Sequence, residues 1–286
     1  MGRIIRLAAL LASLAFPPAY AQYYPPEEND GSGGFSYTAL WWVPAESGWG
    51  LNTNHQDNKV FATLFTYAPD GAPMWLVAPS LTGFPGQTLF TGELYRTTGP
   101  AFDAQPWRAI AFTQVGTMSF EAFSESTARV TYSFNGTTVT KAVQRQVFSS
   151  PVPECAEMPG SRAGVPNYQD LWWNPAESGW GLNMVQQGTI IFATLFTYSP
   201  SGRDLWIVAP DLRRQPDASY TGNIYTTRGT TFNASPWTAV QAVEVGTMTV
   251  WFTNGERATL SYTYNGTTVN KTIERQVFGQ LTPTCR

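Results

Sequence analysis

The feature that most constrains this chain is a twelve-residue segment that occurs twice. WWVPAESGWGLN covers residues 41–52 and WWNPAESGWGLN covers 172–183, so eleven of the twelve positions match. The match continues along the chain, with FATLFTY at 61–67 and again at 192–198. Two copies of so long a period predict two tandem domains of the same fold, because solenoids repeat a shorter unit several times.

Each unit has the residue pattern of a β domain. Val, Thr, Phe and Tyr are frequent, polar and apolar residues alternate over short stretches, and no long amphipathic helical pattern occurs. Asp70-Gly71 and Asn135-Gly136 are strong hairpin signals, because these residue types tolerate the positive φ of primed turns. The pattern predicts eight strands in the first unit, near 36–43, 48–55, 59–68, 74–81, 88–96, 111–122, 127–134 and 138–148.

The predicted fold is therefore all-β, with two tandem antiparallel barrels of eight strands in up-and-down order. Closing a barrel removes the exposed strand edges that so many strands would otherwise leave. A two-sheet β-sandwich is the alternative. A barrel of this size is either filled by its own side chains or holds one small ligand.

The ends and the middle of the chain differ in composition from the two units. Residues 1–21 read as a signal peptide, with Arg3 and Arg6 before an apolar run and cleavage expected after Ala21. A buried N-terminal helix is the other reading. The segments that remain are a flexible leader at 22–36, the first barrel at 37–148, a Pro-rich linker at 149–167 and the second barrel at 168–286. We expect a secreted or periplasmic protein without a transmembrane segment.

Composition argues against several classes of partner. The formal net charge is −3 and the sequence holds no basic stripe, so nucleic acid is not an expected partner. One His and two Cys leave little material for a metal site, and we expect no cofactor.

The two cysteines belong to the repeat, because Cys155 follows Phe148 at the same spacing as Cys285 follows Phe278. An even pair in an exported protein is expected to be oxidised. The simplest bond joins Cys155 to Cys285 within the chain, and a bond between two chains is the alternative.

Glu46, repeated as Glu177, is the most informative single residue, because it lies in a predicted turn between Trp42 and Trp49. A carboxylate flanked by indoles at a barrel mouth suits a saccharide or an aromatic ligand. The structural interpretation is that the Glu46 carboxylate accepts hydrogen bonds from backbone amides of the turn or pairs with a cation.

The last strand supplies two cations on its apolar face, Lys141 and Arg145, which recur as Lys271 and Arg275. Inward-pointing cations need partners, because a buried unpaired charge is costly. We expect Arg145 to stack on Trp49 and to bind Glu46. Lys141 then either meets a polar ligand or reaches water at the rim.

Recurring aromatic and amide residues complete the candidate site. Tyr67, Trp75, Tyr95 and Tyr132 would line a pocket if they point inward, although aromatic core packing is the commoner explanation for such residues, and Asn52 would fix a bulge or a ligand. The predicted ligand-binding residues are Trp42, Glu46, Trp49, Asn52, Tyr67, Trp75, Lys141 and Arg145, with their copies Trp173, Glu177, Trp180, Asn183, Tyr198, Trp206, Lys271 and Arg275.

Two family resemblances bear on these residues. Gly48-Trp49 near the first strands and Arg145 near the end of the last resemble the calycin arrangement of lipocalins and avidins. That resemblance implies that the Trp and the Arg pack together to close one end of the barrel. The repeat as a whole resembles one found in exported proteins of Gram-negative bacteria, which implies export and modularity but no particular activity.

The sequence argues against an enzyme. His55 is the only His and becomes Gln186 in the second unit, so no shared catalytic base is available, and Glu93 and Asp103 are replaced by Asn223 and Asn233. A non-catalytic binding module for a small apolar or aromatic ligand or a saccharide is the first expectation. The alternative is a structural or adhesion module that contacts other exported or cell-surface proteins.

Overall fold

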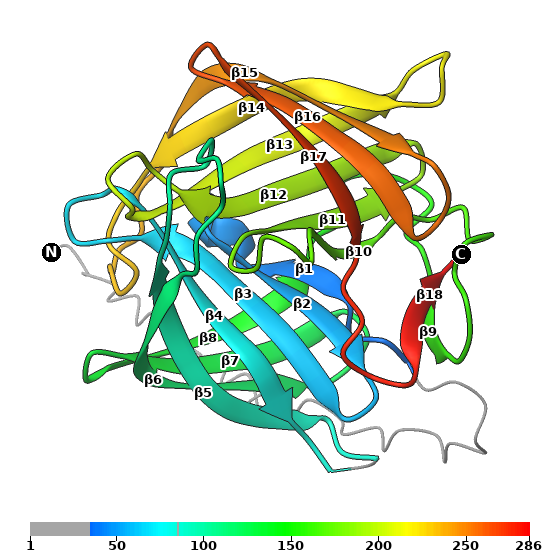
Figure 1. Cartoon of the computed structure of the whole chain (residues 1–286). Coiled ribbons are helices and arrows are strands. Elements are labelled where there is room, and N and C mark those ends of the chain that lie inside the picture. The colour runs from blue at the N-terminus through cyan, green and yellow to red at the C-terminus, as the bar shows by residue number, and fades with distance from the viewer. Residues whose placement is uncertain (1–34, 85) are drawn as a thin grey trace, which may run out of the picture.

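The structure, a computed structural model, describes residues 35–84 and 86–286 and folds them into two closed barrels (Figure 1). Each barrel has eight antiparallel strands in sequential order, which confirms the predicted fold over the sandwich alternative. The first barrel consists of β1 (Ala39–Trp42), β2 (Gly50–Gln56), β3 (Lys59–Tyr67), β4 (Pro73–Thr82), β5 (Leu89–Thr98), β6 (Ala111–Ala122), β7 (Thr127–Phe134) and β8 (Thr137–Arg145). The second consists of β10 (Asp170–Trp173), β11 (Gly181–Gln187), β12 (Ile190–Tyr198), β13 (Asp204–Arg214), β14 (Tyr220–Arg228), β15 (Gln241–Phe252), β16 (Arg257–Tyr264) and β17 (Thr267–Arg275).

Both barrels close in the same way, by pairing the first strand with the last. Trp41 of β1 lies opposite Arg145 of β8, and Trp172 of β10 lies opposite Arg275 of β17. The predicted signal peptide at 1–21 lies outside the described residues, as does the leader up to residue 34.

The two predicted hairpin signals behave differently. Asn135 and Gly136 have φ values of 48° and 83°, as a two-residue primed turn requires. In the turn at Asp70-Gly71 the positive φ, 75°, belongs to Gly71. That turn is wider, because the Ala68 N–H donates to the Ala72 carbonyl at 2.9 Å.

The interior of each barrel is filled by side chains. In the first barrel, Trp41, Leu64 and Phe120 are fully buried in one continuous apolar core, and Tyr132 also points into it. Trp172 occupies the place of Trp41 in the second core. The barrels thus belong to the filled type of small barrel.

The segment expected to be a linker contains a strand of its own. β9 (Cys155–Met158) pairs with β18 (Thr282–Cys285) at the C-terminal end of the chain, beside the barrels in Figure 1. The two cysteines face each other in this ribbon and form the predicted internal disulfide.

The barrels pack directly on each other, with β2–β4 of the first facing β11–β13 of the second (Figure 1). The contacts are reciprocal. The Trp75 indole N–H donates to the Thr197 carbonyl at 3.0 Å, and the Trp206 N–H donates to the Thr66 carbonyl at 3.0 Å. Approximate two-fold symmetry therefore relates the two units.

The loops between β5 and β6 and between β14 and β15 reach across to the opposite barrel. Phe102 of the first loop packs in the second core against Tyr262 and Tyr264. Phe232 of the second loop packs in the first core in the corresponding way, against Tyr132 and Phe134. Each unit thus completes the hydrophobic core of the other.

Candidate ligand-binding site

The repeated Glu46 has a well-defined set of partners. It ends the short 3-10 turn η1 (Pro44–Glu46), where its carboxylate accepts from the Trp49 indole N–H at 3.1 Å and from the Lys141 ammonium at 2.7 Å. Glu177 makes the same two contacts, with Trp180 at 3.1 Å and with Lys271 at 2.6 Å. The carboxylate therefore fixes the indole and neutralises the cation, as the structural interpretation expected.

The expected contact of Arg145 with Glu46 and Trp49 is wrong. Arg145 and Lys141 are four residues apart on one strand, so their Cα atoms are about 13 Å apart along it. Lys141 lies nearer the end of the barrel that carries Glu46. Arg145 instead donates to the Pro153 carbonyl at 2.9 Å.

Arg275 is likewise far from Trp180 and closes the other end of the second barrel. Its guanidinium lies 5.2 Å from the Trp172 ring and 3.3 Å from the Asp170 carboxylate, which also pairs with Arg162. Burial lowers the pKa of Arg275 to about 10. The pairing of an arginine with an indole is thus present, but the indole is Trp172 and not Trp180.

The first barrel lacks this charged cluster. Ala39 stands at the position of Asp170, so Arg145 has no matching carboxylate on β1. Burial lowers the pKa of Arg145 as well.

Four of the predicted aromatic residues lie between the barrels and not inside them. Tyr67, Trp75, Tyr198 and Trp206 are buried together in an apolar cluster on the facing outer surfaces. The expectation that Tyr67 and Trp75 point into a barrel is therefore wrong. Strands β3 and β4 carry apolar residues on both faces, and the second face is covered by the other unit.

The hydroxyls of the two tyrosines hold the repeated PAESGWG segment. Tyr67 donates to the Gly48 carbonyl and Tyr198 to the Gly179 carbonyl, both at 2.6 Å. Gly48 has a φ of 107°, and a Cβ there would lie 2.2 Å from Val240 of the opposite loop. Close approach of the other unit thus explains the glycine.

The predicted amide residues Asn52 and Asn183 also face the junction between the barrels, and both are buried. Asn183 accepts from the Asn54 amide at 2.7 Å and donates to the Thr63 hydroxyl at 3.4 Å. No partner of the Asn52 amide nitrogen lies among the described residues. Asn183 therefore joins the units, whereas Asn52 does not.

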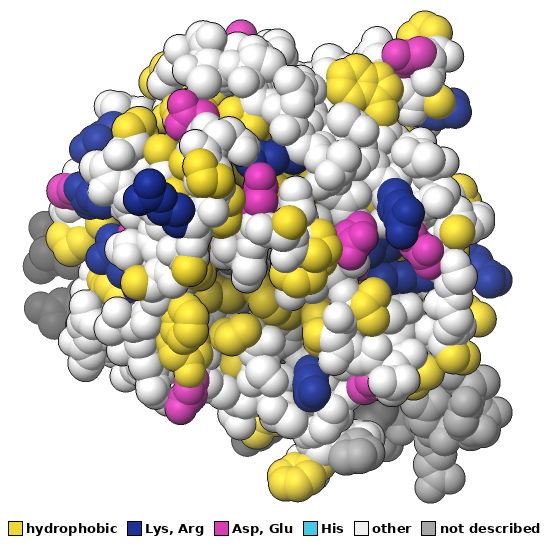
Figure 2. Space-filling model, viewed as in Figure 1, with side chains coloured by type: hydrophobic (Ala, Val, Ile, Leu, Met, Phe, Trp, Pro, Cys, Tyr) yellow, Lys and Arg dark blue, Asp and Glu magenta, His cyan; other side chains and the backbone are white. Residues whose placement is uncertain are grey.

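A cavity of about 390 Å³ opens between the two barrels, where Figure 2 shows hydrophobic side chains along a hollow. It is bounded by β3–β6 of the first unit and by β10, β11 and the preceding PAESGWG segment of the second. Seven aromatic side chains line it: Phe61, Trp75, Tyr95, Phe112, Trp173, Trp180 and Phe196. Trp75, Trp173 and Trp180 are predicted site residues that the structure brings together here.

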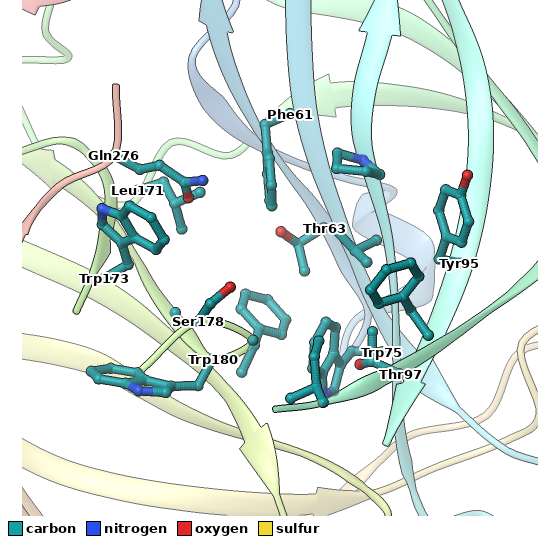
Figure 3. A pocket seen from close by; sticks show the side chains of 17 residues that line it. Phe61, Thr63, Trp75, Tyr95, Thr97, Leu171, Trp173, Ser178, Trp180 and Gln276 are labelled. Atoms are coloured by element: carbon teal, nitrogen blue, oxygen red, sulfur yellow. The ribbon is translucent and has the colours of Figure 1, made fainter. Parts of the chain in front are cut away.

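Few polar groups accompany these rings. Figure 3 shows the hydroxyls of Thr63 and Ser178 directed toward the space between the walls, with the Gln276 amide near Trp173. No Asp, Glu, Lys, Arg or His is among the lining residues that the structure describes. The cavity is therefore apolar, with a small number of hydrogen-bonding groups.

The remaining predicted residues lie away from this cavity. Glu46, Trp49 and Lys141 lie at the mouth of the first barrel, near the Trp237 loop, whose indole N–H donates to the Ser47 carbonyl at 2.9 Å. Sequence reasoning named Tyr95 as a possible lining residue but missed Phe61 and Phe112, which come from outward-facing strand positions. The only signal for them was that apolar residues occur on both faces of β3.

Neither a metal-binding cluster nor a membrane-spanning helix is found in the described residues. They contain no cluster of three or more His, Cys, Asp or Glu side chains placed to hold a metal ion. Among those same residues, no helix has the length and hydropathy needed to cross a membrane.

Compared with protein-family models, with curated proteins and with solved structures, this chain has no match. The resemblances to calycins and to exported bacterial repeats therefore stay predictions. The function has to be argued from the site itself.

Proposed function

We propose that this protein is an exported, non-catalytic binding protein that holds a small, uncharged, mostly aromatic molecule in the cavity between its barrels. The observation that carries the proposal is the lining, in which seven aromatic rings surround about 390 Å³ and the described residues contribute no acidic, basic or His side chain. Cavities that bind small molecules are typically 300–1,000 Å³ in volume, mostly apolar, and contain a few well-placed polar groups.

The lack of charge in the lining selects the class of ligand. A charged molecule would lose hydration on entry and would find no counter-ion among the described lining residues. An aromatic or apolar molecule instead gains from burial and from contact with Trp173 and Trp180, and Thr63 and Ser178 can orient one polar group. A saccharide fits less well, because it has more hydroxyls than the lining has hydrogen-bonding groups to pair with them.

The same lining supports binding without catalysis. Ser178, Thr63 and Thr97 supply hydroxyls, but no His or carboxylate lines the described wall beside them to act as a base. We therefore assign no reaction to this cavity.

A structural or adhesion module is the second candidate. The filled interiors of both barrels favour it, because they leave no room for a ligand inside either one. In that case contacts would be made through the outer surface, and the cavity would bind nothing.

Titration separates these functions. The purified mature protein would be titrated with 2-ethylnaphthalene, an uncharged aromatic probe, and separately with cellotetraose, while tryptophan emission and heat are recorded. We expect saturable binding of the naphthalene and a loss of at least about tenfold in affinity in Trp173→Ala, which removes one ring of the wall.

Trp251→Ala is the matched control, because Trp251 is 41% exposed and lies outside the cavity. It should bind the probe as the unaltered protein does. Binding of cellotetraose alone would replace the proposed ligand class by saccharides. No response to either probe, from a protein with an unchanged circular dichroism spectrum, would favour the surface module.

A further inference from the structure

The approximate two-fold symmetry places an equivalent set of residues on the other side of the molecule. The reciprocal contacts extend beyond the central tryptophans, because the Trp107 indole donates to the Ser178 carbonyl at 3.0 Å and that of Trp237 donates to the Ser47 carbonyl at 2.9 Å. The cavity lies between β3–β6 of the first unit and the PAESGWG segment of the second. The equivalent residues are on β12–β15 of the second unit and in the PAESGWG segment of the first.

The residues of this equivalent set are almost the same. Of the 17 lining residues, 15 are identical at the equivalent position of the other unit, although only about half of all positions match between the units. Buried, half-buried and exposed side chains also occur at the same positions on the two sides. Trp42, for example, is half-buried as Trp173 is.

The two exceptions give the second side smaller side chains. Ala242 replaces Phe112, and Val240 replaces Ile110. Phe112 is an exposed ring at the edge of the cavity, so its absence on the other side removes one aromatic contact.

The second side also carries polar atoms that lack partners. In the cavity, the Thr63 hydroxyl accepts from the Asn183 amide, which Asn54 holds in place. The equivalent atoms are the Thr194 hydroxyl and the Asn52 amide nitrogen, and neither has a hydrogen-bond partner within the described part of the chain. Val185 stands where Asn54 would be needed to hold Asn52.

Trp42 adds a third such atom, because its indole N–H is buried and also has no partner among the described residues. Asn52 and Thr194 are each about 1% exposed. Buried polar groups are nearly always hydrogen-bonded in folded proteins, so these three groups, two from the first unit and one from the second, call for a partner from outside the described residues.

We propose that these equivalent residues form a second cleft, which binds an uncharged aromatic molecule that carries a hydrogen-bond acceptor. The acceptor would bind the N–H groups of Asn52 and Trp42, with the Thr194 hydroxyl beside them, and the aromatic part would lie along the indole and phenyl rings that both sides share. This inference rests on the proposed function, because it takes the same class of ligand. It adds a second site with a different preference.

A matched pair of probes tests the second site. 2-Acetylnaphthalene has a carbonyl acceptor, and 2-ethylnaphthalene has nearly the same shape without one. Calorimetry on the mature protein should give two molecules of the ketone per chain. It should give one tightly bound molecule of the hydrocarbon, because the second cleft lacks Phe112 and gains nothing from a ligand without an acceptor.

Three variants assign the sites. Trp42→Phe keeps a ring but removes the donor, and it should weaken the second ketone event about tenfold, the effect of one lost hydrogen bond. Trp173→Phe, at the equivalent position of the first cavity, should leave the second event unchanged. Asn52→Leu should remove the preference for the ketone at the second site.

The outcomes are distinguishable. One bound ketone per chain, unaffected by Trp42→Phe and Asn52→Leu but weakened by Trp173→Ala, would overturn the second site and leave the proposed function standing. Binding of neither naphthalene would overturn both. Thermal unfolding of each variant checks that the loss of an event does not reflect loss of the fold.

Discussion

At the scale of the residue, the repeated Glu of PAESGWG binds two side chains of its own unit. It holds an indole and a lysine at the mouth of each barrel, and the two copies differ mainly in burial. The side chain of Lys271 is 4% exposed, whereas that of Lys141 is 18% exposed. The free-energy cost of losing the carboxylate charge should follow this difference, because an unpaired cation is more costly the less water reaches it.

Glu46→Gln and Glu177→Gln test this ordering. We expect Glu177→Gln to lower the free energy of unfolding by about 2–3 kcal/mol and Glu46→Gln by about 1 kcal/mol, both measured by urea denaturation. Each variant is the control for the other, because both make the same chemical change at equivalent positions. Equal losses, or a larger loss from Glu46→Gln, would contradict the role given to burial.

A second residue-scale feature is a buried acid beside the only histidine. The Glu157 carboxyl lies 3.6 Å from His55 Nδ1. Burial raises the pKa of Glu157 from 4.5 to about 8 and lowers the pKa of His55 from 6.5 to about 4. Both groups are therefore neutral in the folded protein over the pH range between these values.

These shifts act on stability in opposite directions. Between pH 4.5 and about 8 the unfolded chain ionises Glu157 while the folded chain keeps its proton, so this residue makes the protein less stable as pH rises. His55 makes it less stable as pH falls from 6.5 toward 4. Each slope is at most about 1.4 kcal/mol per pH unit.

Glu157→Gln should therefore gain stability relative to the unaltered protein as pH rises from 5 to 8, whereas His55→Gln should gain as pH falls from 6.5 to 4. Thermal and urea unfolding across this pH range measure both trends. Difference curves that are flat with pH would show that neither group is shifted by burial.

At the scale of the element, the loops between β5 and β6 and between β14 and β15 matter most. They place Phe102 and Phe232 inside the opposite barrels, so each loop contributes to the core of the other unit. They also place Ile110 and Val240 against the glycines of the opposite PAESGWG segments. The PAESGWG segment is thus the same in both units because a loop of the opposite unit packs closely on its glycines.

Phe232→Ala tests the contribution of such a loop. The substitution leaves a cavity in the first core, so we expect a loss of about 3–5 kcal/mol in the free energy of unfolding. Phe84→Ala, at a ring that is 77% exposed, should change it by less than about 0.5 kcal/mol. A loss from Phe232→Ala no larger than that of the control would mean that the loop adds nothing to the core.

At the scale of the whole molecule, the two units are held together at both their facing surfaces and their tails. The disulfide Cys155–Cys285 spans 130 residues of sequence and joins the strands that follow the two barrels. A loop of this length corresponds to a stabilisation of up to about 5 kcal/mol in the chain-entropy model. The real value should be smaller, because the packed barrels already restrict the separation of their tails.

The double variant Cys155→Ser/Cys285→Ser should therefore lower the melting temperature while the β-sheet circular dichroism spectrum stays unchanged. Non-reducing electrophoresis of the unaltered protein gives the control, since an internal bond leaves a single-chain band. A disulfide-linked dimer, or loss of the sheet spectrum in the variant, would contradict this account.

Much of the fold was predictable because its signals are local or repeated. Strand alternation, the Asn135-Gly136 turn and the equal spacing of Cys155 and Cys285 identify barrels, a hairpin and a disulfide from neighbouring or matched residues. The candidate site was less accessible. The sequence singled out Trp75, Trp173 and Trp180, but it placed Trp173 and Trp180 at a barrel mouth and gave Trp75 a place in a pocket only if it pointed inward. It also assigned to Arg145 the carboxylate that Lys141 binds.

The residue pattern was enough to predict two similar barrels of eight strands, with an internal disulfide as the simplest pairing of the two cysteines. The three-dimensional packing was needed to show which apolar face of β3 and β4 points inward, and that the other face packs on the second unit around a cavity. The physical reason is that alternation shows two apolar faces of a strand without saying what covers each one. Contacts such as that between Trp75 and the Thr197 carbonyl join residues far apart in the chain, and no local pattern encodes them.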